Sequence, residues 1–154
     1  MNLVDELHAI AAALTAAGIS YAVCGGIAVT IHGATRTTKD IDVLLEREDV
    51  PRALEAVRPL GYLYAALPMT FDAGTPRERH IQRVSKLEAG QQLVLDLLIA
   101  EAAFDGLLSD RVEIALPQGV LSVVPRHVLL QMKRLAGRPQ DQADIEKLEH
   151  GDEP

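Results

Sequence analysis

Cysteine, tryptophan and long apolar runs are almost absent from this chain. Its 154 residues include one cysteine, no tryptophan, three tyrosines and two phenylalanines. One cysteine excludes an intramolecular disulfide, and it excludes a structural zinc site built from two or more thiolates. Because so few aromatic side chains are present for base stacking, extensive recognition of single strands is not expected.

Membrane signals are also missing. No apolar run approaches the roughly 20 residues that a transmembrane helix needs. The N-terminal sequence MNLVDELHAI has no basic region followed by an apolar one, as a secretory signal would. We therefore expect a cytoplasmic protein without a membrane partner.

The formal net charge is −7, which argues against a protein that coats nucleic acid through its overall charge. Two basic clusters interrupt this average. The first, between Arg126 and Arg138, contains no acidic residue, and the second comprises Arg77, Arg79, His80, Arg83 and Lys86. Each cluster is most simply a solvated surface, although each could also hold a phosphate-bearing ligand.

The length and composition predict a single domain. Hydrophobic residues make up 48% of the chain and charged residues 24%, which is ordinary for a globular protein. We expect one domain over residues 1–154, with a catalytic core over 1–124 and C-terminal helices over 125–150.

Hydrophobic periodicity, glycine and proline indicate alternating helices and strands. Helices are expected at about 3–17, 27–32, 50–60, 125–136 and 140–150, and strands at 21–24, 40–45, 62–67, 80–87, 93–99, 112–116 and 120–124. Residues 68–76 are expected to be a loop. Segment 80–87 also fits helical spacing, but the turn at 88–90 favours a hairpin with 93–99. The predicted fold class is α/β (α+β), a mixed sheet flanked by helices.

Two aspartates stand within one of the predicted strands. Asp40 and Asp42 alternate with apolar residues, so both lie on the same face with Cα atoms roughly 6.6 to 6.8 Å apart. Two such carboxylates suit Mg²⁺, which prefers oxygen ligands. The alternative is an edge strand whose aspartates are simply solvated.

Two further features bear on this choice. Gly25 and Gly26 lie between a strand and a helix, where phosphate can approach a backbone that lacks Cβ atoms. Asp96 interrupts an otherwise apolar strand, and a metal held by Asp40 and Asp42 would give it a partner. A hydrogen-bonded core aspartate would explain Asp96 equally well.

Together, Gly25-Gly26 and the Asp40-Ile41-Asp42 motif resemble the signature of the nucleotidyltransferase superfamily related to DNA polymerase β. Further motifs resemble its AbiEii-like toxin branch: Arg36 and Thr38 in R-x-T-x-D, Asp96 as the third carboxylate, and Lys133, Asp141 and Asp144 in a C-terminal K … D-x-x-D pattern. The resemblance covers about residues 3–148. Gly26 departs from it, because many members have serine there.

The resemblance implies metal-dependent transfer of a nucleoside monophosphate from a nucleoside triphosphate. Two Mg²⁺ ions, or Mn²⁺, would be held by Asp40, Asp42 and Asp96, with Asp96 also a candidate base. The phosphate contacts would come from Gly25, Gly26, Lys133, Arg36 and Thr38.

Several of these assignments have simpler alternatives. Lys133 could be a surface lysine, and Arg36 and Thr38 could merely cap their loop. Asp141 and Asp144 either orient Lys133 or Arg138 by ion pairing or belong to the acidic first turn of a helix.

The resemblance leaves the acceptor open. It suggests an RNA or tRNA end, in a toxin–antitoxin or phage-defence setting with a cognate antitoxin protein. A protein hydroxyl or a small antibiotic is the alternative acceptor. We expect an RNA backbone to contact Arg77, Arg79, Arg83 and Lys86. Other hypotheses are a non-catalytic nucleotide-binding partner protein of the same fold, and a plain α/β domain that matches the motifs by coincidence.

Overall fold

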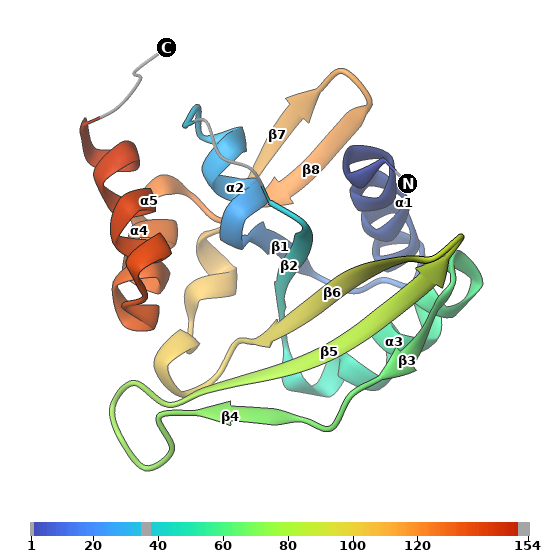
Figure 1. The fold of residues 1–154 in the computed structure, drawn as a ribbon, viewed down its shortest axis with the longest axis horizontal. Coiled ribbons are helices and arrows are strands. Elements are labelled where there is room, and N and C mark those ends of the chain that lie inside the picture. The colour runs from blue at the N-terminus through green and yellow to red at the C-terminus, as the bar shows by residue number, and fades with distance from the viewer. Residues whose placement is uncertain (1, 35–37, 151–154) are drawn as a thin grey trace.

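The computed structural model describes residues 2–34 and 38–150 (Figure 1). Its helices agree closely with the expected ranges and are α1 (Leu3–Ala16), α2 (Gly25–Ile31), α3 (Val50–Val57), α4 (Arg126–Ala136) and α5 (Pro139–His150). Asn2 caps α1 by accepting hydrogen bonds from two backbone N–H groups. None of the helices within the described ranges has the length and apolar character needed to cross a bilayer.

The strands within the same residues form one eight-stranded mixed sheet. They are β1 (Tyr21–Cys24), β2 (Asp40–Leu45), β3 (Tyr62–Ala65), β4 (Met69–Phe71), β5 (Arg79–Glu88), β6 (Gln91–Ile99), β7 (Val112–Leu116) and β8 (Gly119–Val123). Their order is β3-β5-β6-β2-β1-β8-β7, with β4 paired to β5. The pairs β2–β6 and β1–β8 are parallel and the others antiparallel. The predicted fold class is confirmed.

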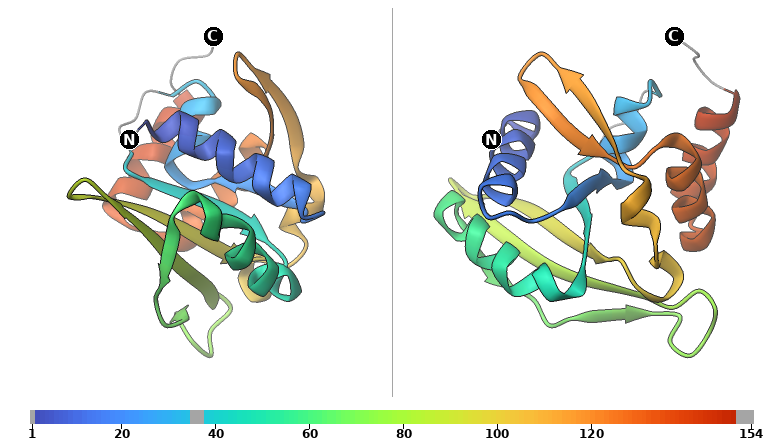
Figure 2. Two further views of the ribbon diagram at one scale, coloured as in Figure 1. Left: turned by 90° about the vertical axis from the view of Figure 1, so that its right-hand side faces the viewer. Right: turned by 180° about the vertical axis from the view of Figure 1, so that it is seen from behind.

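Helices lie on both sides of the central strands. Figures 1 and 2 show α1 and α3 to one side of β1 and β2, and α4 and α5 to the other. Helix α2 packs against β2 and α4. Leu14, Leu44 and Leu121 are fully buried between these layers. Burial of such side chains contributes about 1.5 to 3 kcal/mol each, which holds the helices on the sheet.

The long β5–β6 hairpin fixes which side chains face one another. Its turn is Ala89-Gly90, both with positive φ, and Glu88 pairs with Gln91 beside it. Counting outward from this turn pairs Arg83 with Asp96. The parallel β2–β6 pairing places Asp42 beside the same Asp96. Three charged residues therefore occupy neighbouring positions across three strands.

The expectation of a loop over residues 68–76 is wrong in part. Met69–Phe71 form β4, a short strand that pairs with Arg79–Ile81 of β5. It has only three residues and is mostly exposed, too short for alternation to indicate a strand, so the strand depends on pairing with the neighbouring hairpin.

Candidate active site

One cavity of about 350 Å³ collects most of the predicted site residues. Its walls come from the glycine turn before α2, from the strands β2, β4, β5 and β6, and from the helices α4 and α5. The lining residues include Gly25, Gly26, Thr38, Asp40, Asp42, Asp96, Lys133 and Asp141. The structure thus brings together motifs that are distant in the sequence.

The strand wall carries three carboxylates. Asp40 and Asp42 come from β2, and Asp96 comes from the adjacent β6. Burial, followed by the charges of Asp96 and Asp40, raises the pKa of Asp42 to about 7, although Lys133 and Arg138 partly oppose this. The wall therefore holds more negative charge than its surroundings neutralise.

Gly25 is required for the position of Asp42. Its φ is +67°, in the left-handed region, and a Cβ added there would lie 1.9 Å from Oδ2 of Asp42. No side chain fits at that distance, so glycine permits the close approach of turn and carboxylate.

Cys24 precedes Gly25 in the chain and is fully buried. Its burial, followed by the charge of Asp42, raises the pKa of the thiol well above the usual range. Cys24 is therefore a packed side chain rather than a thiolate.

Arg83 and Asp96 form a bidentate salt bridge. The Nε of Arg83 donates to Oδ1 over 2.8 Å and its Nη2 donates to Oδ2 over 2.9 Å. These hydrogen bonds raise the pKa of the Arg83 guanidinium further, because they stabilise its charged form. Sequence reasoning missed this contact. The signal was nevertheless present, since the turn at 88–90 places residues 83 and 96 opposite each other.

The helix wall is a network around a buried lysine. Lys133 is 5% exposed, and its Nζ lies 3.2 Å from Oδ1 of Asp141 and 3.0 Å from Oδ2 of Asp144. Both aspartates are completely buried. The surface-lysine alternative for Lys133 is therefore wrong, and the ion pairs expected for Asp141 and Asp144 are present.

Arg138 completes this network at the surface. Its backbone N–H and its Nε both donate to Oδ2 of Asp141, over 3.1 and 2.8 Å. Although burial alone would raise the pKa of Asp141, the hydrogen bonds from Arg138 and the Lys133 charge hold it below its usual value. Asp141 therefore remains a carboxylate that fixes Lys133 in place. The functional role of this network stays a prediction.

Of the two other residues expected to contact phosphate, Thr38 and Arg36, only Thr38 lies within the described residues. Thr38 lines the cavity, and its hydroxyl donates to the backbone oxygen of Asp40 over 3.3 Å. This contact matches a loop-capping role, while the side chain is still beside the carboxylates. Arg36 lies outside the described residues.

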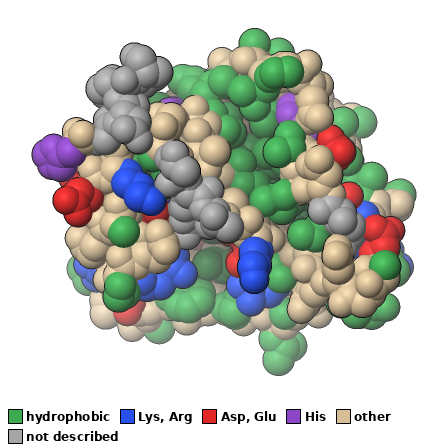
Figure 3. Space-filling model, turned by 45° about the horizontal axis from the view of Figure 1, so that its top comes forward, with side chains coloured by type: hydrophobic (Ala, Val, Ile, Leu, Met, Phe, Trp, Pro, Cys, Tyr) green, Lys and Arg blue, Asp and Glu red, His purple; other side chains and the backbone are tan. Residues whose placement is uncertain are grey.

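The predicted RNA surface does not exist as one patch. Arg77 donates to the backbone oxygens of Arg134 and Leu135, Arg79 pairs with Asp72, Arg83 pairs with Asp96, and Lys86 pairs with Glu6. Alternation along β5 places Lys86 and Arg83 on opposite faces. On the face drawn in Figure 3, basic side chains lie in separate groups rather than in one continuous patch. The expected placement of RNA across all four is wrong.

The donor set fits a divalent cation in part. Asp40 and Asp42 have no salt-bridge partner within 2–34 and 38–150, and hard oxygen ligands on one cavity wall suit Mg²⁺. Both oxygens of Asp96 are occupied by Arg83. Accordingly, among the described residues no three acidic, His or Cys side chains are already arranged around a common point. Asp40 and Asp42 are thus the residues that fit a metal as they stand.

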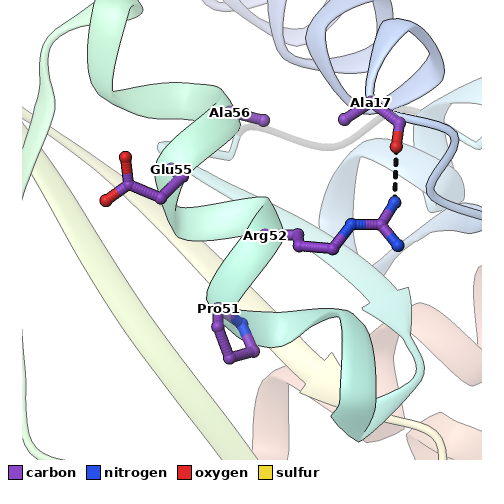
Figure 4. Close-up of a pocket in the computed structure, with 5 residues that line it drawn as sticks. All are labelled: Ala17, Pro51, Arg52, Glu55 and Ala56. Atoms are coloured by element: carbon purple, nitrogen blue, oxygen red, sulfur yellow. Dashed lines mark hydrogen bonds between the residues drawn. The ribbon is translucent and has the colours of Figure 1, made fainter.

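A second hollow lies between α1 and α3 (Figure 4). It is wide and open, and it is lined by Ala17, Pro51, Arg52, Glu55 and Ala56. The guanidinium of Arg52 donates to the backbone oxygen of Ala17, which joins the two helices. Its lining lacks every residue proposed above, so it is a poorer candidate than the carboxylate cavity.

The sequence matches no protein-family model, and it matches none of the curated proteins. Solved structures nevertheless share the fold. TM1012 from Thermotoga maritima, a nucleotidyltransferase candidate, has a TM-score of 0.65 at 13% identity, covering 94% of this chain and 90% of its own.

The antibiotic-resistance factor ANT(2'')-Ia is similar to a comparable extent. Its solution structure has a TM-score of 0.60 at 15% identity, covering 94% of this chain and 80% of its own. A crystal structure of the same factor with adenylyl-2''-tobramycin has a TM-score of 0.56 at 16% identity, covering 92% and 84%. Identities this low show the fold alone.

Proposed function

We propose that this chain is a metal-dependent nucleotidyltransferase, which moves a nucleoside monophosphate from a nucleoside triphosphate to an acceptor hydroxyl. One observation carries the proposal. Asp40, Asp42 and Asp96 share a single cavity wall beside the Gly25–Gly26 turn and the buried Lys133. The fold shared with TM1012 and ANT(2'')-Ia supports the same reaction class.

Charge at the carboxylate wall supports a bound cation. A carboxyl group whose pKa is raised to about 7 by burial and by two neighbouring carboxylates is stabilised by any cation placed among them. Asp40 and Asp42 would hold Mg²⁺, or Mn²⁺, and Asp96 belongs to the same wall. A bound divalent cation would stabilise the negative charge on the attacking and leaving oxygens, and the family resemblance implies two such ions.

The chain's own groups account for the rest of the reaction. Gly25 and Gly26 leave the backbone accessible to the outer phosphates, and Lys133 adds a fixed positive charge. The acceptor oxygen forms a bond to the α-phosphorus while the bond from that phosphorus to the bridging oxygen breaks. Pyrophosphate leaves with the electron pair, and Asp96 is the carboxylate that accepts the hydroxyl proton.

As acceptor we propose the end of an RNA or tRNA, and as biological setting a toxin–antitoxin or phage-defence system with a cognate antitoxin. It rests on the sequence motifs. The crystal complex of ANT(2'')-Ia contains an adenylylated antibiotic, so a small-molecule acceptor is a second candidate. A non-catalytic partner protein is less well supported, because Asp40 and Asp42 share one cavity wall without a salt-bridge partner among the described residues, and such a pair is costly to retain without a cation.

Transfer of label tests the proposal. Purified protein is incubated with each nucleoside triphosphate labelled at the α-phosphate, Mg²⁺, and either total RNA, lysate protein or tobramycin. Asp42→Asn should abolish labelling of every acceptor. Asp110→Asn makes the same change at an exposed position outside the cavity and should label as the unmodified protein does. Undiminished labelling by Asp42→Asn, or nucleotide binding that is indifferent to Mg²⁺, would contradict the proposal.

A further inference from the structure

The two edges of the sheet differ in how well they are protected. One edge consists of β3 and β4, two short strands that are separated by Pro68, with a register shift between Tyr62 and Tyr64. Irregularities and prolines of this kind discourage pairing with another chain. The other edge is β7, which pairs with β8 alone and without a register shift over its five residues. Figure 1 shows its hairpin at the periphery of the molecule.

The backbone of β8 determines which groups of β7 face outward. The N–H of Val124 donates to the backbone oxygen of Val23 in β1 over 3.0 Å. Because the backbone groups of a strand point alternately to its two neighbours, the residues on either side of that direction, Leu121 and Val123, point their N–H and C=O groups to β7.

The partners of these two residues in β7 are Ile114 and Val112, so their N–H and C=O groups are used within the hairpin. Glu113 and Ala115 alternate with them, and their backbone groups therefore point away from β8. Within 2–34 and 38–150, no hydrogen bond satisfies the N–H and C=O groups of these two residues. Backbone groups left open along an edge are a template for a further strand.

The open segment ends at the same distance on either side of Ile114. Three residues before it, the N–H of Arg111 already donates to the backbone oxygen of Leu108 over 3.3 Å. Three residues after it, Pro117 has no N–H to donate. A strand that satisfies this segment must therefore offer two N–H and two C=O groups at the same spacing. An antiparallel second copy of β7 offers them.

We propose that two copies of this chain associate edge to edge through β7, antiparallel and with the two-fold axis at Ile114. Glu113 of each copy then lies opposite Ala115 of the other. Each of these two pairs exchanges two hydrogen bonds, which satisfies every outward N–H and C=O group of both segments. The inference is independent of the proposed function.

The side chains of β7 fit the same register. Val112, which is 40% exposed, lies opposite Leu116 of the other copy, and Ile114 lies opposite its own counterpart. Ile114 and Leu116 already pack against the core, so this pairing extends an apolar face. An axis at Glu113 would instead place two carboxylates directly opposite each other, which is destabilising.

The mass of the protein in solution tests the association. A pair of five-residue strands is at the small end of specific interfaces, so we expect a dissociation constant in the micromolar range. In sedimentation equilibrium over a series of micromolar concentrations, the mass should rise from 16.7 kDa toward twice that value.

Ala115→Pro removes an outward N–H and leaves the hydrogen bonds to β8 in place, as proline is tolerated at such edge positions. By symmetry two hydrogen bonds are lost from the dimer, so the association constant should fall at least roughly tenfold. Ala115→Val is the matched control, because it keeps the N–H and should dimerise within about twofold of the unmodified protein. A thermal melt of each variant shows whether the fold is retained.

Disulfide formation tests the register independently. Ile114→Cys places two cysteines opposite each other with Cα atoms about 4.5 Å apart, within the range of a disulfide. Val112→Cys is the control on the same face of the same strand, where the two cysteines would be more than about 13 Å apart. The native Cys24 is buried and should not interfere. After oxidation, Ile114→Cys should run as a covalent dimer on a non-reducing gel and Val112→Cys as a monomer.

Three results would overturn the inference. The first is a mass that stays at that of one chain throughout the concentration series. The second is dimerisation of a folded Ala115→Pro variant as strong as that of the unmodified protein. The third is a covalent dimer of Val112→Cys formed as readily as that of Ile114→Cys. If Ala115→Pro does not fold, the two cysteine variants decide the matter, and none of these readouts depends on nucleotide transfer.

Discussion

Replacing Gly25 by alanine tests whether the turn after β1 determines the geometry of the carboxylate wall. The new Cβ would lie 1.9 Å from Oδ2 and 2.8 Å from Cβ of Asp42, so the aspartate must rotate or the turn must open. A left-handed residue other than glycine costs roughly 1 to 2 kcal/mol. Moving Asp42 off its rotamer adds about 0.5 to 1.5 kcal/mol. We expect a total loss of about 1.5 to 3.5 kcal/mol in the free energy of unfolding.

Gly90→Ala provides the matched control. Gly90 has a φ of +77°, similar to that of Gly25, but nothing lies within 4 Å of a Cβ added there. Gly90→Ala should lose only the cost of the left-handed backbone conformation, about 1 to 2 kcal/mol of the free energy of unfolding. Urea denaturation measures both losses, and Mn²⁺ titration followed by electron paramagnetic resonance measures the cation site. Only Gly25→Ala should lose Mn²⁺ binding.

Two outcomes would refute this reasoning. If Gly25→Ala is no less stable than Gly90→Ala, the clash is relieved without cost, and the turn does not determine the position of Asp42. If Gly25→Ala binds Mn²⁺ as the unmodified protein does, the cation is not held where Asp42 lies.

The charges of the cavity lead to further predictions. Because the folded pKa of Asp42 is about 7 and its ordinary value is 3.8, the folded state binds the proton more tightly. The stability of the metal-free protein should therefore fall as pH rises from about 4 to about 7, by roughly 2 to 4 kcal/mol. Asp42→Asn should remove that slope in urea denaturation at a series of pH values; an unchanged slope would assign it to another group. Mg²⁺ affinity measured by calorimetry should rise with pH through about 7, since the cation needs the carboxylate, and a flat profile would count against Asp42 as a ligand. Lys133→Met should lower the free energy of unfolding by about 3 kcal/mol, because it leaves the buried Asp141 and Asp144 without their shared cation. Arg138→Gln changes a side chain that is 70% exposed, and should lower the free energy of unfolding by no more than about 1 kcal/mol. Equal losses in denaturation would show that the lysine is not the centre of the network.

Elements with a local signal were predictable from the sequence. Asp40–Leu45 alternates acidic and apolar residues, and the structure gives the same strand with the aspartates on one face. Gly137 ends α4 in the left-handed conformation, as its position after an apolar helical face indicates. In such segments the spacing of apolar residues and the residue that ends the element indicate the same structure, so the local sequence pattern agrees with the fold.

The partners of charged residues were less predictable. Arg83 and Lys86 look equivalent in the sequence, yet one holds Asp96 in the cavity and the other holds Glu6 of α1 on the opposite face. The first pairing follows from the hairpin register. The second depends on how α1 packs across the sheet, which no local pattern encodes. Lys133 was identified by motif, but its burial depends on α5 supplying two carboxylates.

The order of synthesis has a consequence for this cavity. The glycine turn and Asp42 emerge early from the ribosome, whereas Lys133 and its carboxylate partners emerge only after the whole sheet has been made. A nascent chain that has folded β1, β2, β5 and β6 still lacks one wall of the pocket. The cavity is therefore completed only late in translation, when α4 and α5 dock, and prematurely terminated products are expected to lack the Lys133 wall.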